Sequence, residues 1–259
     1  MTKPIVTRRA MLRHTAAAAS LLLTPRFAGT GEQPHRKPNI VIILIDDMGW
    51  KDVGFMGSPC YETPHVDRLA RQGIVFTSAY TNAPNCAPTR ACIMSGQYGP
   101  RHGIFTVGTS ERGKSQDRKL IPIENNTRLS PDVVTLAESL RRGGYVCGHI
   151  GKWHLGDEGE TGPKAQGFHN RFGANWGGHP RHYFFPPDSG KPQGKYLTDQ
   201  LTDDAIGFME DNKDRPFFLN LWHHAVHTPH EAIQEKIEKY KSKEETPDYF
   251  NPVYAAMIE

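Results

Sequence analysis

A cysteine, a proline and an arginine stand at fixed spacing in residues 85–96, which read Asn-Cys-Ala-Pro-Thr-Arg-Ala-Cys-Ile-Met-Ser-Gly. Pro88 suits the first turn of a helix, because the amide hydrogen that proline lacks has no intrahelical partner there. Cys86 is therefore expected at a helix N-terminus, which attracts anions and activates a thiol. Arg90 follows four residues later, so its guanidinium should lean over the sulfur. The spacing predicts a cysteine nucleophile, and a small buried cysteine without chemistry is the alternative.

Two adjacent carboxylates, Asp46 and Asp47, follow the apolar run 40–45. Such a run predicts a strand buried on both faces of a largely parallel sheet, whose functional groups gather at the carboxyl ends of the strands. Neighbouring carboxylates repel each other unless a cation lies between them. Their oxygens suit Ca²⁺, and Mg²⁺ less well, rather than zinc. The alternative is ordinary turn chemistry after a strand.

A third group is the string Gly-Lys-Trp-His-Leu-Gly at 151–156. If the chain stays extended there, Lys152 and His154 point to the same side, because side chains alternate along a strand. An ammonium and an imidazole projected together suit a doubly charged oxyanion. A fourth group follows the apolar run 216–222 and contains His223, His224 and the string His-Thr-Pro-His at 227–230.

The elements that must position these groups follow from periodicity. The predicted helices are 63–73, 136–144, 198–211 and 231–245. The predicted strands are 39–45, 74–76, 145–150 and 216–222. Residues 157–195 are rich in Gly, Pro, His and aromatic side chains, which predicts loops that frame a substrate cleft and favours a carbohydrate ligand. His169, His179 and His182 lie in this stretch, and surface positions are the simpler interpretation for them.

Composition sets the outer limits. The 259 residues are enough for one large α/β domain or two small ones. The net charge is only +3, with 31 basic and 28 acidic residues interspersed, which argues against a nucleic-acid partner. The four cysteines, at 60, 86, 92 and 147, form no Cys-x-x-Cys pair, and a bond between Cys60 and Cys147 stays open.

The N-terminus carries Arg8 and Arg9 before a short apolar run at 16–23. This pattern predicts a twin-arginine export signal over residues 1–30, and a disordered basic tail is the alternative. The run is too short to span a membrane. We expect the twin-arginine translocation machinery to deliver the protein to the periplasm or the outside. Residues 31–38 are then a linker, and residues 39–259 are the catalytic region.

The four groups occur in the order in which they occur in the sulfatase family, which this chain resembles. The resemblance rests on Cys-x-Pro-x-Arg at 86–90, the string at 151–156, the His-Thr-Pro step at 227–229 and the aspartate pair. It covers most of the chain, from residue 39 to 230. It implies an alkaline phosphatase-like fold, in which helices sandwich a mixed, largely parallel central sheet.

The resemblance also implies the chemistry. In sulfatases a formylglycine-generating enzyme converts the cysteine into Cα-formylglycine, whose hydrated aldehyde attacks the sulfur of a sulfate monoester. Carried onto this chain, Asp46, Asp47 and the modified Cys86 would hold Ca²⁺, and Arg90 would hold the hydrated aldehyde. The groups that neutralise the sulfuryl oxygens would be Lys152, His154 and His227, with His230 a weaker alternative to His227.

The substrate would be a sulfated small molecule or glycan, with aryl, polysaccharide and glycosaminoglycan sulfates left open. A hydrolase of phosphonate or phosphate monoesters is the alternative enzyme, and a ratio of kcat/KM on aryl sulfate and aryl phosphonate separates the two. A non-catalytic binder of sulfated glycans, or an inactive product, is the alternative from another class.

The chain departs from the family pattern at its end. In sulfatases a later Asp-Asn pair completes the calcium shell and a further lysine contacts the sulfate, but this chain stops at Glu259, in what resembles the helix before that segment. Calcium takes about 6–8 oxygen ligands, which the groups above do not supply. We therefore expect this stretch alone to bind Ca²⁺ weakly and to turn over poorly.

Overall fold

The computed structural model describes residues 36–157, 159–172, 180–185, 194–243 and 247–259. The chain divides into two units, Met1–Lys37 and Pro38–Glu259, and the fold below is that of the second unit. The predicted export signal at 1–30 lies outside the described residues, as does most of the linker. Among the helices that are described, none has the length and apolar character needed to cross a bilayer.

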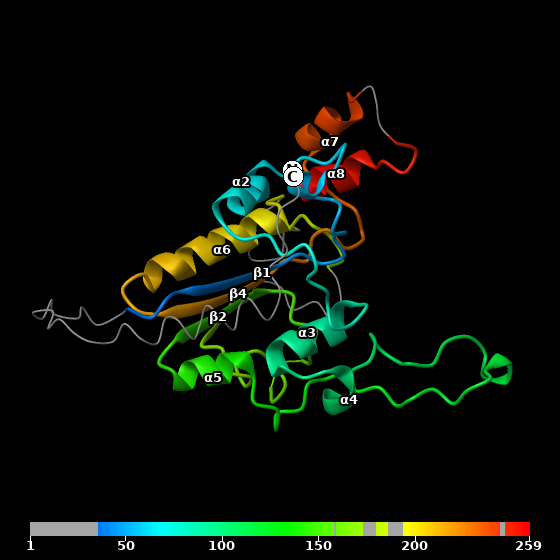
Figure 1. The fold of residues 1–259 in the computed structure, drawn as a ribbon, viewed down its shortest axis with the longest axis vertical. Helices are drawn as coiled ribbons and strands as arrows, with labels where there is room; N and C mark the ends of the chain where they lie inside the picture. The colour runs from blue at the N-terminus through cyan, green and yellow to red at the C-terminus, as the bar shows by residue number, and fades with distance from the viewer. Residues whose placement is uncertain (1–35, 158, 173–179, 186–193, 244–246) are drawn as a thin grey trace, which may run out of the picture. The chain divides into compact units, whose positions relative to one another are not determined.

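A four-stranded parallel sheet forms the centre of the second unit, with the strand order β1-β4-β2-β3 (Figure 1). Its strands are β1 (Ile40–Leu44), β2 (Val146–Gly151), β3 (Asn170–Phe172) and β4 (Phe217–Trp222). β4 is central and all its residues are buried, as its unbroken apolar run predicts. Because every pairing is parallel, the carboxyl ends of β1, β4 and β2 meet at one edge of the sheet.

Helices cover both faces of this sheet. The described helices are α2 (Pro64–Gln72), α3 (Cys86–Ser95), α4 (Gly99–His102), α5 (Leu136–Arg142), α6 (Leu197–Asp211), α7 (Gln234–Lys241) and α8 (Pro252–Ile258), with short 3-10 turns η2 (Gly54–Met56) and η3 (Ser115–Asp117). α6 packs on one face, and α3 and α5 lie on the other (Figure 1). Each face therefore has its own hydrophobic cluster, and the sheet lies between them.

Local sequence chemistry fixes where the helices begin. Thr135 and Glu138 form a reciprocal capping box at the start of α5, in which the Thr135 hydroxyl accepts from the Glu138 amide and the Glu138 carboxylate accepts from the Thr135 amide. Pro64 and Pro252 occupy the first helical positions of α2 and α8. Asn251 caps α8 through its side-chain oxygen.

Most predicted elements are confirmed, with shifted ends. The predicted helices at 63–73, 136–144 and 198–211 correspond to α2, α5 and α6, and the strands at 145–150 and 216–222 to β2 and β4. The helix predicted at 231–245 is shorter, because α7 begins only at Gln234. Its face is not wholly solvated either, since Tyr240 is buried. The prediction missed β3, which lies in the loop-like stretch 157–195.

Two predictions about the sheet are wrong. Residues 74–76 form no strand, and Ile74 and Phe76 are exposed. β1 is not buried on both faces: Val41 is 42% and Ile43 is 55% exposed. The reason is position, because β1 is the edge strand of the described sheet and α6 packs against β2 and β4. The disulfide left open above does not form either, since all four cysteines are free.

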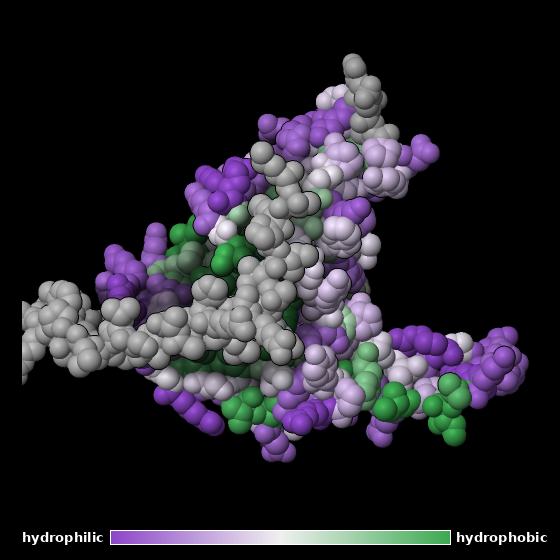
Figure 2. Space-filling model, viewed as in Figure 1, coloured by the Kyte–Doolittle hydropathy of each residue, from purple (hydrophilic) through white to green (hydrophobic). Residues whose placement is uncertain are grey.

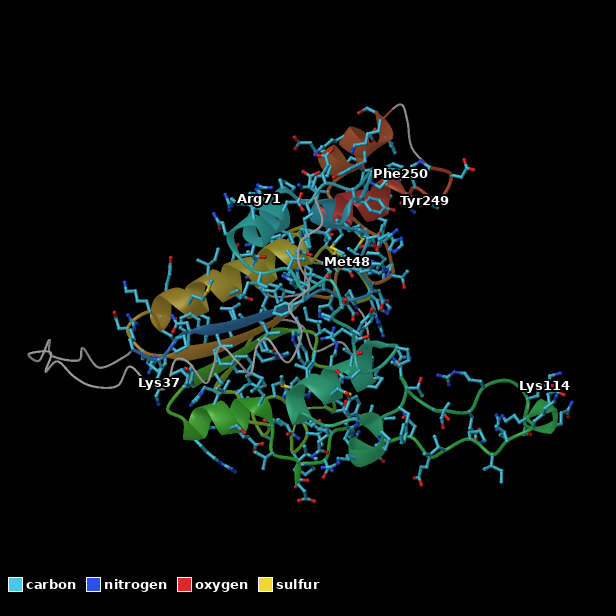
Figure 3. All side chains as sticks on the ribbon, in the orientation of Figure 1. Lys37, Met48, Arg71, Lys114, Tyr249 and Phe250 are labelled. Atoms are coloured by element: carbon cyan, nitrogen blue, oxygen red, sulfur yellow. The ribbon has the colours of Figure 1, made fainter. Side chains whose placement is uncertain are left out.

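The long loop between α4 and α5 extends away from the sheet, with η3 and Lys114 at its tip (Figure 3). Leu120, Ile121 and Ile123 on this loop are exposed, and hydrophobic and hydrophilic side chains alternate along it (Figure 2). The base of the loop returns to α3, because Nδ2 of the Asn85 side chain donates to the Thr106 hydroxyl at 3.3 Å. The loop is therefore anchored beside the first residue of that helix.

Candidate functional site

The predicted site residues meet at the carboxyl edge of the sheet. Asp46 follows β1, Lys152 follows β2 and His227 follows β4, and these three strands are neighbours in the order β1-β4-β2. Met48, two residues beyond Asp46, is labelled in Figure 3 and marks this edge. The fourth element is α3, whose first residue is Cys86.

Asp46 is the electrostatic centre of the site. Its Oδ1 accepts from Arg90 Nη2 at 2.9 Å, and its Oδ2 accepts from Lys152 Nζ. The side chains of Arg90 and Lys152 are 0% exposed and that of Asp46 is 4% exposed. Burial alone raises the pKa of Asp46, but the charges and hydrogen bonds of the two cations outweigh it and lower that pKa. The carboxylate therefore stays ionised between two buried cations.

Arg90 joins three elements. From α3 it reaches Asp46 after β1, and its Nη1 donates to the Lys152 carbonyl oxygen at 2.7 Å. Its guanidinium also lies over the Trp222 ring, 4.8 Å from the centroid, which is cation–π geometry. Planar, multidentate contact of this kind requires arginine rather than lysine. Arg90 thereby holds the helix that carries Cys86 against the ends of all three strands.

Cys86 is the first residue of α3, as the sequence predicts, and it is half-buried. Asn85 precedes it in extended conformation, and Pro88 falls in the first turn. The hydrogen bonds of the Arg90 guanidinium go to Asp46 and to the Lys152 carbonyl. Cys86 is still a neighbour: burial lowers the pKa of Arg90, and nearby acidic groups, Cys86 among them, raise it in part.

Asp47 adopts a left-handed conformation with φ 61, and its side chain is 54% exposed. Its Oδ2 lies 3.4 Å from Nε2 of His227. The chain beyond β4 is held here by two backbone hydrogen bonds, from the Asp46 amide to Ala225 and from the Val226 amide to Asp46. These bonds extend the β1–β4 ladder and bring His227 beside the aspartate pair.

Tyr183 supports the same turn, and sequence reasoning missed it. Its ring is fully buried, and its hydroxyl lies 2.7 Å from the carbonyl oxygens of both His224 and His227. Burial is the main cause that raises the pKa of Tyr183 above its usual range. The only signal in the sequence was the aromatic run 183–185, which indicated packing but not this contact.

Lys152 and His154 converge on the site, but not by strand alternation. Gly151 has φ 96 and His154 has φ 60, so the chain turns there instead of continuing β2. Lys152 is buried against Asp46. Burial, together with the charges of Lys152 and Arg90, lowers the pKa of His154 to about 4. His154 is therefore neutral at pH 7, and its Nδ1 has no hydrogen-bond partner within the described residues.

The other histidines named in the sequence analysis make contacts outside the group around Asp46. His223 is buried and its amide extends the ladder to Leu44, while His224 is buried beside it. His169 accepts from the Cys147 amide through Nδ1, and His182 pairs with Glu231 at 3.1 Å. His230 contacts the Tyr254 ring. His179 lies outside the described residues.

The possible metal ligands at this edge of the sheet fit a hard cation only in part. Asp46, Asp47 and His227 offer ligand atoms that all lie within 4.8 Å of one another. Carboxylate oxygens match the preference of Ca²⁺ or Mg²⁺. Both oxygens of Asp46 are, however, already engaged by Arg90 and Lys152. Cys86, predicted as a third ligand, is not in this group of the described residues.

Comparison with known proteins gives one consistent result. The family model "Sulfatase" matches residues 38–258. A sulfatase of Formosa agariphila is 31% identical and covers 92% of this chain and 54% of its own length. The N-acetylgalactosamine-6-sulfatase of Mus musculus is 32% identical and covers 83% of this chain and 45% of its own. The chain thus spans about half the length of the curated relatives it matches.

The fold agrees with that match. The crystal structure of Ps i-CgsB in complex with k-i-k-neocarrahexaose aligns with a TM-score of 0.68 and 30% identity, over 86% of this chain and 52% of that one. The parallel sheet between helix layers is the α/β architecture of the alkaline phosphatase-like fold, as the resemblance implied. The chain belongs to the sulfatase family.

Proposed function

We propose that this chain carries the nucleophile and the sulfate-binding groups of a sulfuric ester hydrolase. The observation that supports this most is the junction made by Arg90. It ties the helix that begins at Cys86 to Asp46 and to the Lys152 carbonyl, 2.9 Å and 2.7 Å away. Residues distant in sequence thereby surround the start of one helix, where an anion is stabilised.

The nucleophile is residue 86 after a formylglycine-generating enzyme has oxidised it to Cα-formylglycine. In that step dioxygen accepts the electrons, the C–S bond breaks and the sulfur leaves as hydrogen sulfide. The hydrated aldehyde supplies two hydroxyl groups on one carbon. One attacks sulfur and displaces the alcohol of the ester; the other then loses its proton, so that the C–O bond to the sulfate breaks, sulfate leaves and the aldehyde re-forms. A cysteine or serine has no second group of this kind. Arg90 fixes the position of residue 86, because its guanidinium is held at both ends and cannot swing away.

The sulfate oxygens are neutralised by groups that the fold already gathers. Lys152 contributes a buried positive charge, and His227 stands beside Asp47 at the rim. His154 is neutral at pH 7 and offers its ring as a hydrogen-bond partner rather than a charge. Such fixed dipoles and charges stabilise the charge that shifts as the S–O bond of the ester breaks. A Ca²⁺ ion held by Asp46 and Asp47 would fix sulfate oxygens and withdraw charge from them.

The substrate is a sulfated small molecule or glycan. The mouse relative is named for a sulfated aminosugar, and the structure of Ps i-CgsB holds a neocarrahexaose. We also propose that the protein is exported by the twin-arginine machinery, on the grounds of Arg8 and Arg9. Export after folding suits a residue that must be modified inside the cell.

Mass spectrometry tests the central step. The tryptic peptide 72–90 contains Cys86 and ends at Arg90. After expression in the native host it should show replacement of the thiol by an aldehyde or its hydrate. Peptides with Cys92 or Cys147 serve as internal controls and should keep their thiols. If residue 86 remained a cysteine throughout, hydrolysis by this route would be ruled out and a non-catalytic binder of sulfated glycans would be favoured.

A further inference from the structure

A cavity of about 300 Å³ opens beside the proposed reacting centre. Its lining includes Ala87, which follows the nucleophile, and His154, so it adjoins the residues proposed to bind the sulfate. Small-molecule sites range from about 300 to 1,000 Å³, so this one accepts a single compact unit. It is the place where the alcohol part of a sulfate ester would lie.

One wall of the cavity is rigid and polar. Asn125 closes the turn at 105–108: its Oδ1 accepts from the amides of Phe105 and Thr106 at 2.7 and 3.1 Å, and its Nδ2 donates to Gly108 at 2.5 Å. Thr106 also accepts from Asn85, the residue before the nucleophile. The wall is therefore fixed relative to residue 86 before any ligand arrives.

The outer rim carries an ion pair, Arg128 with Asp157. Both side chains are exposed, 62% and 73%, and such a pair contributes only about 0–1 kcal/mol to stability. The backbone beneath it is firm, because the Leu129 amide donates to the Leu155 carbonyl at 2.8 Å and both leucines are buried. A ligand can thus separate the pair at little cost while the two residues keep their positions.

The lining has the chemistry of polyol recognition. It combines a guanidinium donor, a carboxylate acceptor, threonine hydroxyls and glycine backbone with the apolar Ala87 and Val107, and the His154 imidazole is the one aromatic ring among the described residues that line it. Arg128 and Asp157 together satisfy both the acceptor and the donor atoms of neighbouring sugar hydroxyls. An aryl group has no hydroxyls for this pair, and no Phe, Tyr or Trp ring is among the described residues that line the cavity.

We propose that Arg128 and Asp157 select a sulfated sugar over an aryl sulfate, with one sugar ring held in this cavity. The proposal rests on the function proposed above, since it assumes that the sulfate group lies near residue 86. Arg128 and Asp157 recognise the sugar hydroxyls, whereas the residues around residue 86 recognise the sulfate group. Arg128 and Asp157 are therefore specificity residues outside the reacting centre.

Binding calorimetry on the full chain with unmodified Cys86 and excess calcium tests this without turnover. The probes are N-acetylgalactosamine 6-sulfate and 4-nitrophenyl sulfate. Arg128→Ala and Asp157→Ala should each raise the Kd of the sugar sulfate about tenfold, the effect of losing a charged hydrogen bond. The Kd of the aryl sulfate should change less than about twofold. Arg128→Lys should also bind the sugar sulfate more weakly than the wild type, because lysine lacks the planar guanidinium group.

Lys241→Ala is the matched control, since Lys241 forms an exposed ion pair with Glu238 far along the sequence on α7. It should leave both Kd values unchanged. Equal losses for both probes, or no loss for the sugar sulfate, would overturn the proposal. A third outcome is that peptide 72–90 contains formylglycine but the protein binds only the aryl sulfate. That result would overturn the proposed sugar selection while leaving the proposed hydrolysis intact. Absence of both modification and binding would remove both proposals together.

Discussion

The paired cations around Asp46 make it the most constrained residue of the site. Its two carboxylate oxygens take Arg90 and Lys152, both fully buried. A single buried charge left without its partner is strongly destabilising, whereas a paired one is tolerated. Asp47, its neighbour, is half-exposed and contacts only the rim histidine among the pairs described. The neighbouring aspartates Asp46 and Asp47 thus have different structural roles.

We predict that Asp46→Asn lowers the free energy of unfolding by about 3–5 kcal/mol, because two buried cations lose their counter-charge. Asp47→Asn is the matched control. It should cost less than about 1 kcal/mol, since the position is exposed and asparagine tolerates its left-handed φ. Urea denaturation followed by circular dichroism compares the two. Equal losses would contradict this account of Asp46.

His223 gives a prediction for acid stability. Burial lowers the pKa of His223 to about 4. The unfolded chain, with a histidine pKa of about 6.5, then takes up a proton before the folded chain does. The contribution of His223 to stability is therefore complete above about pH 6.5 and is lost as the pH falls from there towards 4.

Between pH 7 and pH 5 the loss from this one group is about 2 kcal/mol. His223→Phe removes the titrating ring while keeping apolar bulk. Between pH 7 and pH 5 the free energy of unfolding of this variant should therefore fall by about 2 kcal/mol less than that of the wild type. Val66→Phe, at an exposed position on α2 without a titrating group, should keep the wild-type dependence. Denaturation curves at both pH values measure this difference. An equal change in the free energy of unfolding for wild type and His223→Phe would contradict the lowered pKa of His223.

At the scale of elements, the end of β2 depends on a glycine. Gly151 has φ 96, and a Cβ built there would lie 2.0 Å from the Trp222 carbonyl oxygen. The close approach lets the Lys152 amide donate to that same oxygen at 2.8 Å. The turn after β2, and with it the placement of Lys152 and His154, therefore requires the absence of a side chain.

Gly151→Ala should lower the free energy of unfolding by more than about 2 kcal/mol, because strain at positive φ adds to a clash with backbone. Gly159→Ala is the matched control: its φ is 97, but nothing lies within 4 Å of its Cβ position. That variant should cost only about 1 kcal/mol. Thermal unfolding measures both, and a similar cost at the two positions would show that the contact with Trp222 does not matter.

At the scale of the whole molecule, the metal site is the part that the described residues leave incomplete. Asp46 and Asp47 offer at most four carboxylate oxygens, and Arg90 and Lys152 already engage those of Asp46. Calcium takes about 6–8 oxygens. We expect this chain alone to bind Ca²⁺ with a Kd above about 100 µM, within the weak range of calcium sites. Calorimetric titration with Asp47→Ala as control tests this, and tight one-to-one binding would refute it.

The sequence by itself determined the chemistry and the main elements. Cys86 at a helix start, the aspartate pair after an apolar strand and the Gly-bounded string at 151–156 are local patterns, because helix starts and strand ends depend on nearby residues. Those patterns placed α3, α5, α6, β2 and β4 close to where they lie. They also carried the resemblance to sulfatases before any fold was known.

Only the tertiary structure decided which groups touch. Arg90 pairs with Asp46 and with the Lys152 carbonyl, and Tyr183 supports the turn of His227. The chain turns Lys152 into the site directly after Gly151, whose φ is 96. It also decided that β1 is an edge strand and that residues 74–76 pair with nothing described. Such facts depend on strand order and on partners far away in the chain, which no local pattern encodes.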